Sequence, residues 1–137
     1  MSYLIDTNVL SELRRREPNA QVVAWMHARP RQSLYLSVLS LGEIRKGIEG
    51  VAEPAFRQTL TDWLEVELRH YFVGRLLDID EAVADRWGRV QAASGRSLPV
   101  IDGLLAATAL QHDLSLVTRN TRDFESLGIR LINPWQA

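Results

Sequence analysis

The sequence contains no cysteine among its 137 residues. This absence excludes disulfide bonds, thiolate zinc sites, iron–sulfur clusters and cysteine nucleophiles, and it is consistent with a reducing compartment. Lysine is almost absent as well, since Lys46 is the only one and all other Lys/Arg residues are arginine. Biased codon usage is one explanation. The other is that arginine binds phosphate in a planar, bidentate geometry that lysine lacks.

No apolar run in the sequence resembles a membrane span. The most apolar stretch, residues 100–110, is interrupted by Asp102, and Asp6 stands where a secretory signal needs an apolar core. We therefore expect a soluble protein of the cytoplasm without membrane contact. The net charge of −1 gives no overall basic field. The 46% of hydrophobic residues excludes intrinsic disorder, and the length predicts one domain spanning residues 1–137.

Five short apolar segments alternate with helical patterns along the chain. The segments predict strands at residues 3–5, 34–39, 73–77, 114–117 and 131–132. The spacing of apolar residues predicts helices at residues 7–16, 20–26, 40–48, 53–71, 82–93 and 101–111. Strands separated by helices need crossover connections, which favour parallel pairing. The predicted fold class is therefore α/β, a three-layer sandwich whose central, mostly parallel sheet is flanked by helices.

Four acidic residues fall at the predicted carboxyl edge of this sheet, where α/β proteins bind ligands. Asp6 follows the first strand directly, and Glu43 is expected in the first turn of the helix after the second strand. Asp123 follows the strand that ends near Thr118, and Asp102 begins a helix that can start on the same side. We expect these four acids, which are far apart in sequence, to meet in space.

Each of these acids also has a purely structural explanation. Glu43 lies three residues after Ser40, which is the spacing of a capping box. Asp102 suits the dipole of a first helical turn, and Asp123 can cap the turn that follows it. Asp6 serves the fold only if it caps locally. The placement of all four acids at one edge favours a functional site.

A cluster of carboxylates favours a bound cation. Two carboxylates about 4 Å apart repel by roughly 4 kcal/mol at an effective dielectric of about 20, so one would otherwise take up a proton. The donors are all oxygens, which favours Mg²⁺ or Mn²⁺ over Zn²⁺. Metal-assisted hydrolysis of a phosphodiester bond by an activated water is the chemistry of such a site.

A phosphatase that uses an aspartyl nucleophile is the weaker explanation of the acids. It needs a second aspartate two positions after the first, where this chain has Asn8. It also needs a lysine near the phosphoryl group, and Lys46 is expected to face solvent one turn below Glu43.

Arginine and tryptophan side chains are candidates for substrate contact. Arg119 and Arg122 flank Asn120 and Asp123, so they can hold a phosphate beside the metal, although a solvated surface explains any single arginine. The four tryptophans can stack on bases or on a partner, and helical spacing favours core positions for two of them. These are Trp25, Trp63, Trp87 and Trp135, of which Trp63 and Trp87 have that spacing.

Four motifs follow one another in order, and the chain ends in Leu131-Ile-Asn-Pro-Trp135. The motifs are Leu4-Ile-Asp-Thr-Asn-Val-Leu10, the pair Ser40 and Glu43, Leu98-Pro-Val-Ile-Asp102 with Ala106-Ala-Thr-Ala109, and Val117-Thr-Arg-Asn-Thr-Arg-Asp-Phe124. Over essentially the whole chain they resemble PIN-domain proteins. The resemblance is strongest to VapC toxins of bacterial type II toxin–antitoxin pairs, in the branch typified by FitB.

The resemblance implies an Mg²⁺-dependent endoribonuclease, with Mn²⁺ as an alternative ion and tRNA as the expected substrate class. It implies inhibition by a cognate antitoxin of the VapB or FitA kind, a homodimer, possible higher-order assembly with the antitoxin, and promoter DNA contact only through the antitoxin. The implied catalytic acids are Asp6, Glu43, Asp102 and Asp123. The implied metal ligands are Asp6 and Asp102, and the supporting polar residues are Thr7, Thr118 and Asn120.

Two positions depart from the family pattern. Gly103 stands where alanine is usual and is expected to weaken the helix start slightly, while Asp113 replaces the usual glycine of a turn. Neither is one of the four acids. The alternative function is a nucleic-acid-binding regulatory module that acts with its antitoxin and cleaves little. An acidic cluster that repels phosphate disfavours that alternative.

Overall fold

The computed structural model describes residues 1–137 and contains one five-stranded sheet of order β3-β2-β1-β4-β5. All four strand pairs are parallel. The strands are β1 (Tyr3–Ile5), β2 (Leu34–Ser37), β3 (Leu76–Leu77), β4 (Ser115–Val117) and β5 (Leu131–Ile132). The parallel α/β sandwich predicted from the sequence is confirmed.

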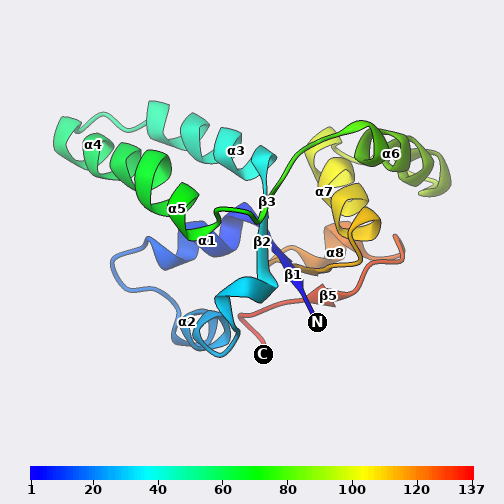
Figure 1. Ribbon diagram of the computed structural model, residues 1–137, viewed down its shortest axis with the longest axis horizontal. Helices are drawn as coiled ribbons and strands as arrows, with labels where there is room; N and C mark the ends of the chain where they lie inside the picture. The colour runs from blue at the N-terminus through cyan, green and yellow to red at the C-terminus, as the bar shows by residue number, and fades with distance from the viewer.

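Helices connect the strands and cover both faces of the sheet (Figure 1). The helices are α1 (Thr7–Leu13), α2 (Ala20–His27), the 3-10 turn η1 (Arg31–Ser33), α3 (Val38–Glu49), α4 (Pro54–Asp62), the π-helical segment η2 (Trp63–Leu68), α5 (Arg69–Tyr71), α6 (Glu81–Ala93), α7 (Val100–Gln111) and α8 (Thr121–Phe124). No helix is long and apolar enough to span a membrane.

Two hydrophobic cores lie on opposite sides of the sheet. The larger core joins β1 and β2 to α1, α2, α3 and η2, and its members include Val9, Trp25 and Phe72. The smaller core joins the sheet to α6, α7 and α8 and includes Leu105 and Phe124. Burial on both faces explains why β1 is apolar at all three positions instead of alternating.

The central position of β1 brings distant segments to one edge of the sheet. Tyr3 lies opposite Leu34 of β2 and Ser115 of β4 in the parallel register. The carboxyl ends of the three central strands therefore meet at the same edge. The segments that follow them begin at Asp6, Val38 and Thr118.

The predicted helix over residues 40–48 begins earlier in the structure, and this changes the place of Glu43. The second strand ends at Ser37, whose hydroxyl caps α3 by accepting from the Leu39 N–H. Glu43 therefore lies in the second turn of α3, and the predicted capping box with Ser40 does not form. The predicted helix over residues 53–71 is continuous but contains the π-helical segment η2.

Gly103 has a packing role that the sequence did not indicate. A Cβ atom at this position would lie 2.7 Å from Gln91 Oε1 and 3.0 Å from Trp87 Nε1. Both side chains belong to α6, so glycine permits the close approach of α6 to the first turn of α7. That turn carries Asp102, and the helix packing therefore helps to fix its place.

Asp113 forms the turn before β4 in a left-handed conformation, with φ of 53°. Aspartate tolerates this region better than most residues with a side chain. Arg130 Nη2 donates to the Asp113 carbonyl at 3.0 Å and to its carboxylate at 3.1 Å. Arg130 therefore supports the turn in which Asp113 replaces the usual glycine.

Candidate functional site at the carboxyl edge of the sheet

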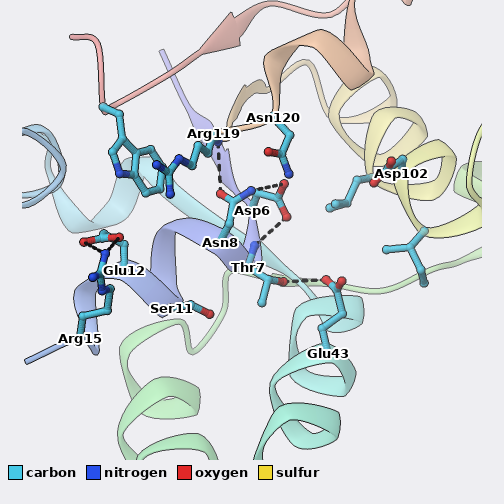
Figure 2. Close-up of a pocket in the computed structure, with 13 residues that line it drawn as sticks. Asp6, Thr7, Asn8, Ser11, Glu12, Arg15, Glu43, Asp102, Arg119 and Asn120 are labelled. Carbon is cyan, nitrogen blue, oxygen red and sulfur yellow. Dashed lines mark hydrogen bonds and ion pairs between the residues drawn. The ribbon is translucent and has the colours of Figure 1, made fainter. Parts of the chain in front are cut away.

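A cavity of about 580 Å³ opens at the carboxyl edge of the sheet (Figure 2). Three of the predicted acids line it, and they come from three separate segments of the chain. Asp6 follows β1, Glu43 lies on α3 and Asp102 lies on α7. The other lining residues are Thr7, Asn8, Ser11, Glu12, Arg15, Ile101, Leu105, Arg119, Asn120 and Trp135.

Asp6 is the most enclosed of these acids, with 8% of its surface exposed. It is the N-cap of α1, and its Oδ1 accepts the Thr7 N–H at 2.7 Å. Its Oδ2 accepts the Thr118 hydroxyl at 2.8 Å. Burial raises the pKa of Asp6, as do the charges of Glu43 and Asp102, while the two hydrogen bonds oppose the shift. The local cap is real, but it does not explain why two further acids face this carboxyl group.

Glu43 is held by the threonine that follows Asp6. The Thr7 hydroxyl donates to Glu43 Oε1 at 2.7 Å and lies 2.8 Å from Ser40 Oγ. The spacing of Ser40 and Glu43 is that of a capping box. In the structure this spacing instead places both side chains beside the Thr7 hydroxyl. This bond connects α1 to α3 across the acidic pocket.

Asp102 lies in the first turn of α7 and is partly buried. Burial raises its pKa, and the charges of Asp123 and Glu43 add to this effect, whereas Arg96 opposes it. Asp123 lies in the short helix α8 and does not line the cavity. Its charge nevertheless acts on Asp102, so all four predicted acids belong to one electrostatic group.

Asn8 and Thr118 join the start of α1 to the loop after β4. The Asn8 amide donates to Thr118 Oγ1 at 3.2 Å, and its Oδ1 accepts the Arg119 N–H at 3.2 Å. Thr118 Oγ1 also accepts the Asn120 N–H at 3.1 Å. Thr118 therefore supports Asp6 directly, whereas the sequence offered no role for Asn8 in this network.

Arg119 and Arg122, the two predicted substrate-binding residues, occupy different places. Arg119 lines the cavity and lies over the Trp135 ring, with its guanidinium carbon 5.0 Å from the ring centroid. Arg122 lies on α8 and is exposed, and it is not among the residues that line the cavity.

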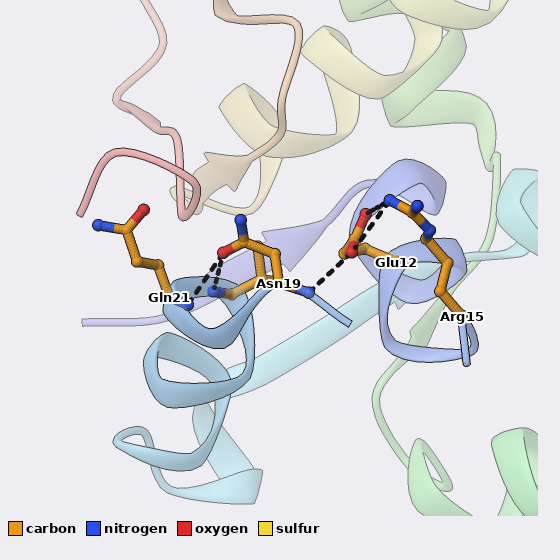
Figure 3. A network of polar contacts seen from close by, with 5 residues as sticks. Glu12, Arg15, Asn19 and Gln21 are labelled. Atoms are coloured by element: carbon orange, nitrogen blue, oxygen red, sulfur yellow. Dashed lines mark hydrogen bonds and ion pairs between the residues drawn. The ribbon is translucent and has the colours of Figure 1, made fainter. Parts of the chain in front are cut away.

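Glu12 is a buried acid that the sequence analysis missed. Only 4% of its surface is exposed, and its carboxylate accepts the Asn19 N–H at 2.8 Å and Arg15 Nη1 at 3.2 Å (Figure 3). The bond from the Asn19 N–H is the main cause that lowers the pKa of Glu12. The sequence contains one indication of this role: Glu12 stands among the apolar positions of α1 and shortly before Asn19, the cap of the next helix.

The acidic side chains suit a hard divalent cation, although no three acidic or histidine side chains are close enough together to bind the same ion. Mg²⁺ needs only one or two carboxylates, because it keeps several waters. The donors in the cavity are oxygens. Burial raises the pKa values of Asp6 and Asp102, with a smaller contribution from neighbouring acids, and a bound cation would favour the charged carboxylates. These residues therefore suit Mg²⁺ or Mn²⁺.

The protein is thus a parallel α/β protein with an acidic pocket at the carboxyl edge of its sheet, and the pocket is suited to a cation. The chain belongs to the PIN-domain family, whose model matches residues 3–129. It is 36% identical to Toxin FitB of Neisseria gonorrhoeae, with 96% of this chain and 97% of the relative covered. It is 35% identical to VapC ribonuclease Y4jK of Sinorhizobium fredii, with 97% of each chain covered.

A solved structure agrees with this assignment across the whole fold. The FitAcB crystal structure from Neisseria gonorrhoeae superposes with a TM-score of 0.92 at 35% identity, covering 98% of this chain and 99% of that one. The sequence-based recognition of the family and of its FitB-like branch is therefore confirmed.

Proposed function

We propose that this protein is the toxin of a type II toxin–antitoxin pair and acts as an Mg²⁺-dependent endoribonuclease. The observation that carries the proposal is the meeting of Asp6, Glu43 and Asp102 in one cavity, where burial and mutual repulsion raise the pKa of two of them. The similarity to a toxin and to a ribonuclease supports the same conclusion.

In this mechanism Asp6 and Asp102 would hold a divalent ion, and Glu43 and Asp123 would complete the acidic site. When bound there, the ion would supply Lewis-acid activation of water and charge stabilisation at the phosphodiester. The Thr118 hydroxyl holds Asp6 Oδ2, so Oδ1 remains on the Thr7 N–H and the carboxylate is fixed in orientation.

Other residues orient the remaining polar groups of the site. The Thr7 hydroxyl holds Glu43, which can then orient the attacking water or accept its proton. Asn120 supports the loop through Thr118. Arg119 and Arg122 neutralise phosphates of the RNA, since arginine can bind a phosphate through two parallel hydrogen bonds.

The proposed partners follow from the same assignment. RNA is the substrate, with tRNA as its class, and a cognate antitoxin of the VapB or FitA kind inhibits the enzyme. The toxin forms a homodimer, and larger assemblies with the antitoxin contact promoter DNA through the antitoxin. We expect the activity to occur in the cytoplasm.

The test is cleavage of a defined RNA pool that includes tRNA by the purified protein. We expect cleavage with Mg²⁺ or Mn²⁺ and none with a chelator, and mapping of the new ends at nucleotide resolution identifies the bond. Asp6→Asn serves as the inactive control. RNA binding without cleavage at any divalent ion concentration would instead support the regulatory module.

A further inference from the structure

The cavity has two chemically different ends. Figure 2 shows Glu43 and Asp102 on one side of Asp6, and Arg119 with Arg15 on the other. The volume of about 580 Å³ is within the range of pockets that hold drug-sized ligands. The cavity therefore has room for more than the single phosphate that the acidic end would bind.

The two arginines at the basic end differ in their availability. Arg15 is paired with Glu12 at 3.2 Å, so its charge is largely compensated. The Arg119 guanidinium forms no ion pair and donates no hydrogen bond, because its contacts with Asn8 and Asn133 use main-chain atoms only. Arg119 is thus the cation of this cavity whose donors are all free for a ligand.

Trp135 holds this free guanidinium in place. The Arg119 guanidinium carbon lies 5.0 Å from the centroid of the indole ring, within the range of a cation–π interaction. The indole is half-buried against the larger core, and this packing limits the movement of the ring under the guanidinium. Asn133 connects the two segments. Its Oδ1 accepts the main-chain N–H of Trp135 at 2.9 Å, and its Nδ2 donates to the Arg119 carbonyl at 3.5 Å.

We propose that Arg119 and Trp135 form a second subsite, in which Arg119 binds the phosphate of the nucleotide next to the scissile bond. Trp135 is a positioning residue: it limits the conformations of a long side chain before RNA arrives, which lowers the entropy lost on binding. This inference rests on the proposed function, since it assigns one part of the same cavity to a neighbouring phosphate of the RNA.

The test measures binding of a labelled single-stranded RNA in an Asp6→Asn background, in which cleavage is blocked. Arg119→Gln should weaken binding about tenfold, the value of one charged hydrogen-bonding contact. It should also reduce the slope of log affinity against log salt by about 0.7, because one phosphate contact is lost. Trp135→Leu should weaken binding about threefold, and Trp135→Phe should restore most of it.

The decisive measurement is the double variant. If Trp135 acts through Arg119, Trp135→Leu has no further effect on RNA affinity once Arg119 is glutamine. A full effect of Trp135→Leu in the Arg119→Gln protein would overturn the positioning role. Should Trp135→Leu not fold, Arg119→Lys tests the same idea, because lysine keeps the charge but loses the planar stack, and binding equal to that of arginine contradicts it.

Two controls match the substitutions in kind. Arg69→Gln removes an exposed arginine far along the chain on α5, and Trp63→Leu removes another half-buried indole that contacts an arginine, Arg14. Equal losses in the controls would mean that general charge or stability causes the effect. If the wild type cleaves RNA and Arg119→Gln binds it normally, only the subsite is wrong. If the wild type neither cleaves nor binds RNA, the proposed function itself fails.

Discussion

The two ends of α1 each carry a buried carboxylate, and the two carboxylates are held in opposite ways. Asp6 precedes the helix with 8% of its surface exposed, and Glu12 lies near its end with 4% exposed. Burial and neighbouring acids raise the pKa of Asp6, whereas the bond from the Asn19 N–H lowers the pKa of Glu12. Burial alone therefore does not distinguish the acid proposed for function from the structural one.

The difference lies in what surrounds each carboxylate. Glu12 meets a cation and a main-chain donor, Arg15 and the Asn19 N–H, so its charge is satisfied within the fold. Asp6 also accepts a main-chain N–H, that of Thr7, but in place of a cation it meets two further acids, Glu43 and Asp102, and this repulsion is left for a ligand to resolve. An acid that the fold leaves uncompensated is a candidate for binding and catalysis.

The largest expected effect is the loss of activity in Asp6→Asn. Loss of a carboxylate proposed to bind the metal should remove several kcal/mol of transition-state stabilisation, so RNA cleavage should fall by about a thousandfold. The metal-free protein should be as stable as the wild type or more stable, because the repulsion from Glu43 and Asp102 is removed. Cleavage rates and thermal unfolding in a chelator measure both quantities. Retained cleavage together with lost stability would reverse the assignment.

Glu12→Gln should show the converse pattern. The amide lacks the charge that pairs with Arg15, and its single oxygen cannot accept both the Asn19 N–H and Arg15 Nη1 in the way that the two carboxylate oxygens do. We expect the midpoint of thermal unfolding to fall by several degrees. Cleavage by the folded protein at low temperature should fall far less than in Asp6→Asn. A loss of cleavage comparable with that of Asp6→Asn would place Glu12 in the catalytic set.

Mg²⁺ should stabilise the protein by binding at the acids near Asp6, before α1, and not at Glu12 near the end of that helix. An ion at about ten times its dissociation constant adds roughly 1.4 kcal/mol, which corresponds to a few degrees in the unfolding midpoint. The shift should survive in Glu12→Gln and disappear in Asp102→Asn. A flat titration of the wild type across millimolar Mg²⁺ would contradict convergence of the acids on a cation.

The sequence was sufficient to predict the parallel sheet and three acids that the structure brings into one cavity, Asp6, Glu43 and Asp102. The apolar runs at 3–5 and 131–132 are strands with those bounds. These features are local, because a strand end depends on a few adjacent residues. The acids could be placed together because parallel strands end at one edge.

Features that depend on contacts between distant segments could not be predicted in the same way. The α3 cap moved from Ser40 to Ser37, and Glu43 bonds to Thr7 from another helix. The reason for Gly103 lies in side chains of α6, and the burial of Glu12 depends on where α2 begins. A single sequence shows which residues can cap or pair, but not which of these partners the packing selects.

The smallest expected effect is the opposite dependence of stability on pH at the two ends of α1. The raised pKa of Asp6 means that the metal-free folded state takes up a proton before the unfolded chain does. Asp6 therefore costs stability at neutral pH, and the cost disappears as the pH falls from its raised pKa to the ordinary aspartate range. Glu12 contributes stability above the ordinary glutamate range, which is lost as the pH falls through its lowered pKa.

Difference curves of thermal unfolding against pH in a chelator isolate these small contributions. The stability gained in Asp6→Asn should be greatest near neutral pH and should vanish on acidification. The stability lost in Glu12→Gln should also be greatest near neutral pH, but it should persist to lower pH than the gain from Asp6→Asn. Because the two differences have opposite signs, a general effect of acid on the fold cannot produce both. Two curves of the same sign would show that the ends of α1 do not differ as their surroundings indicate.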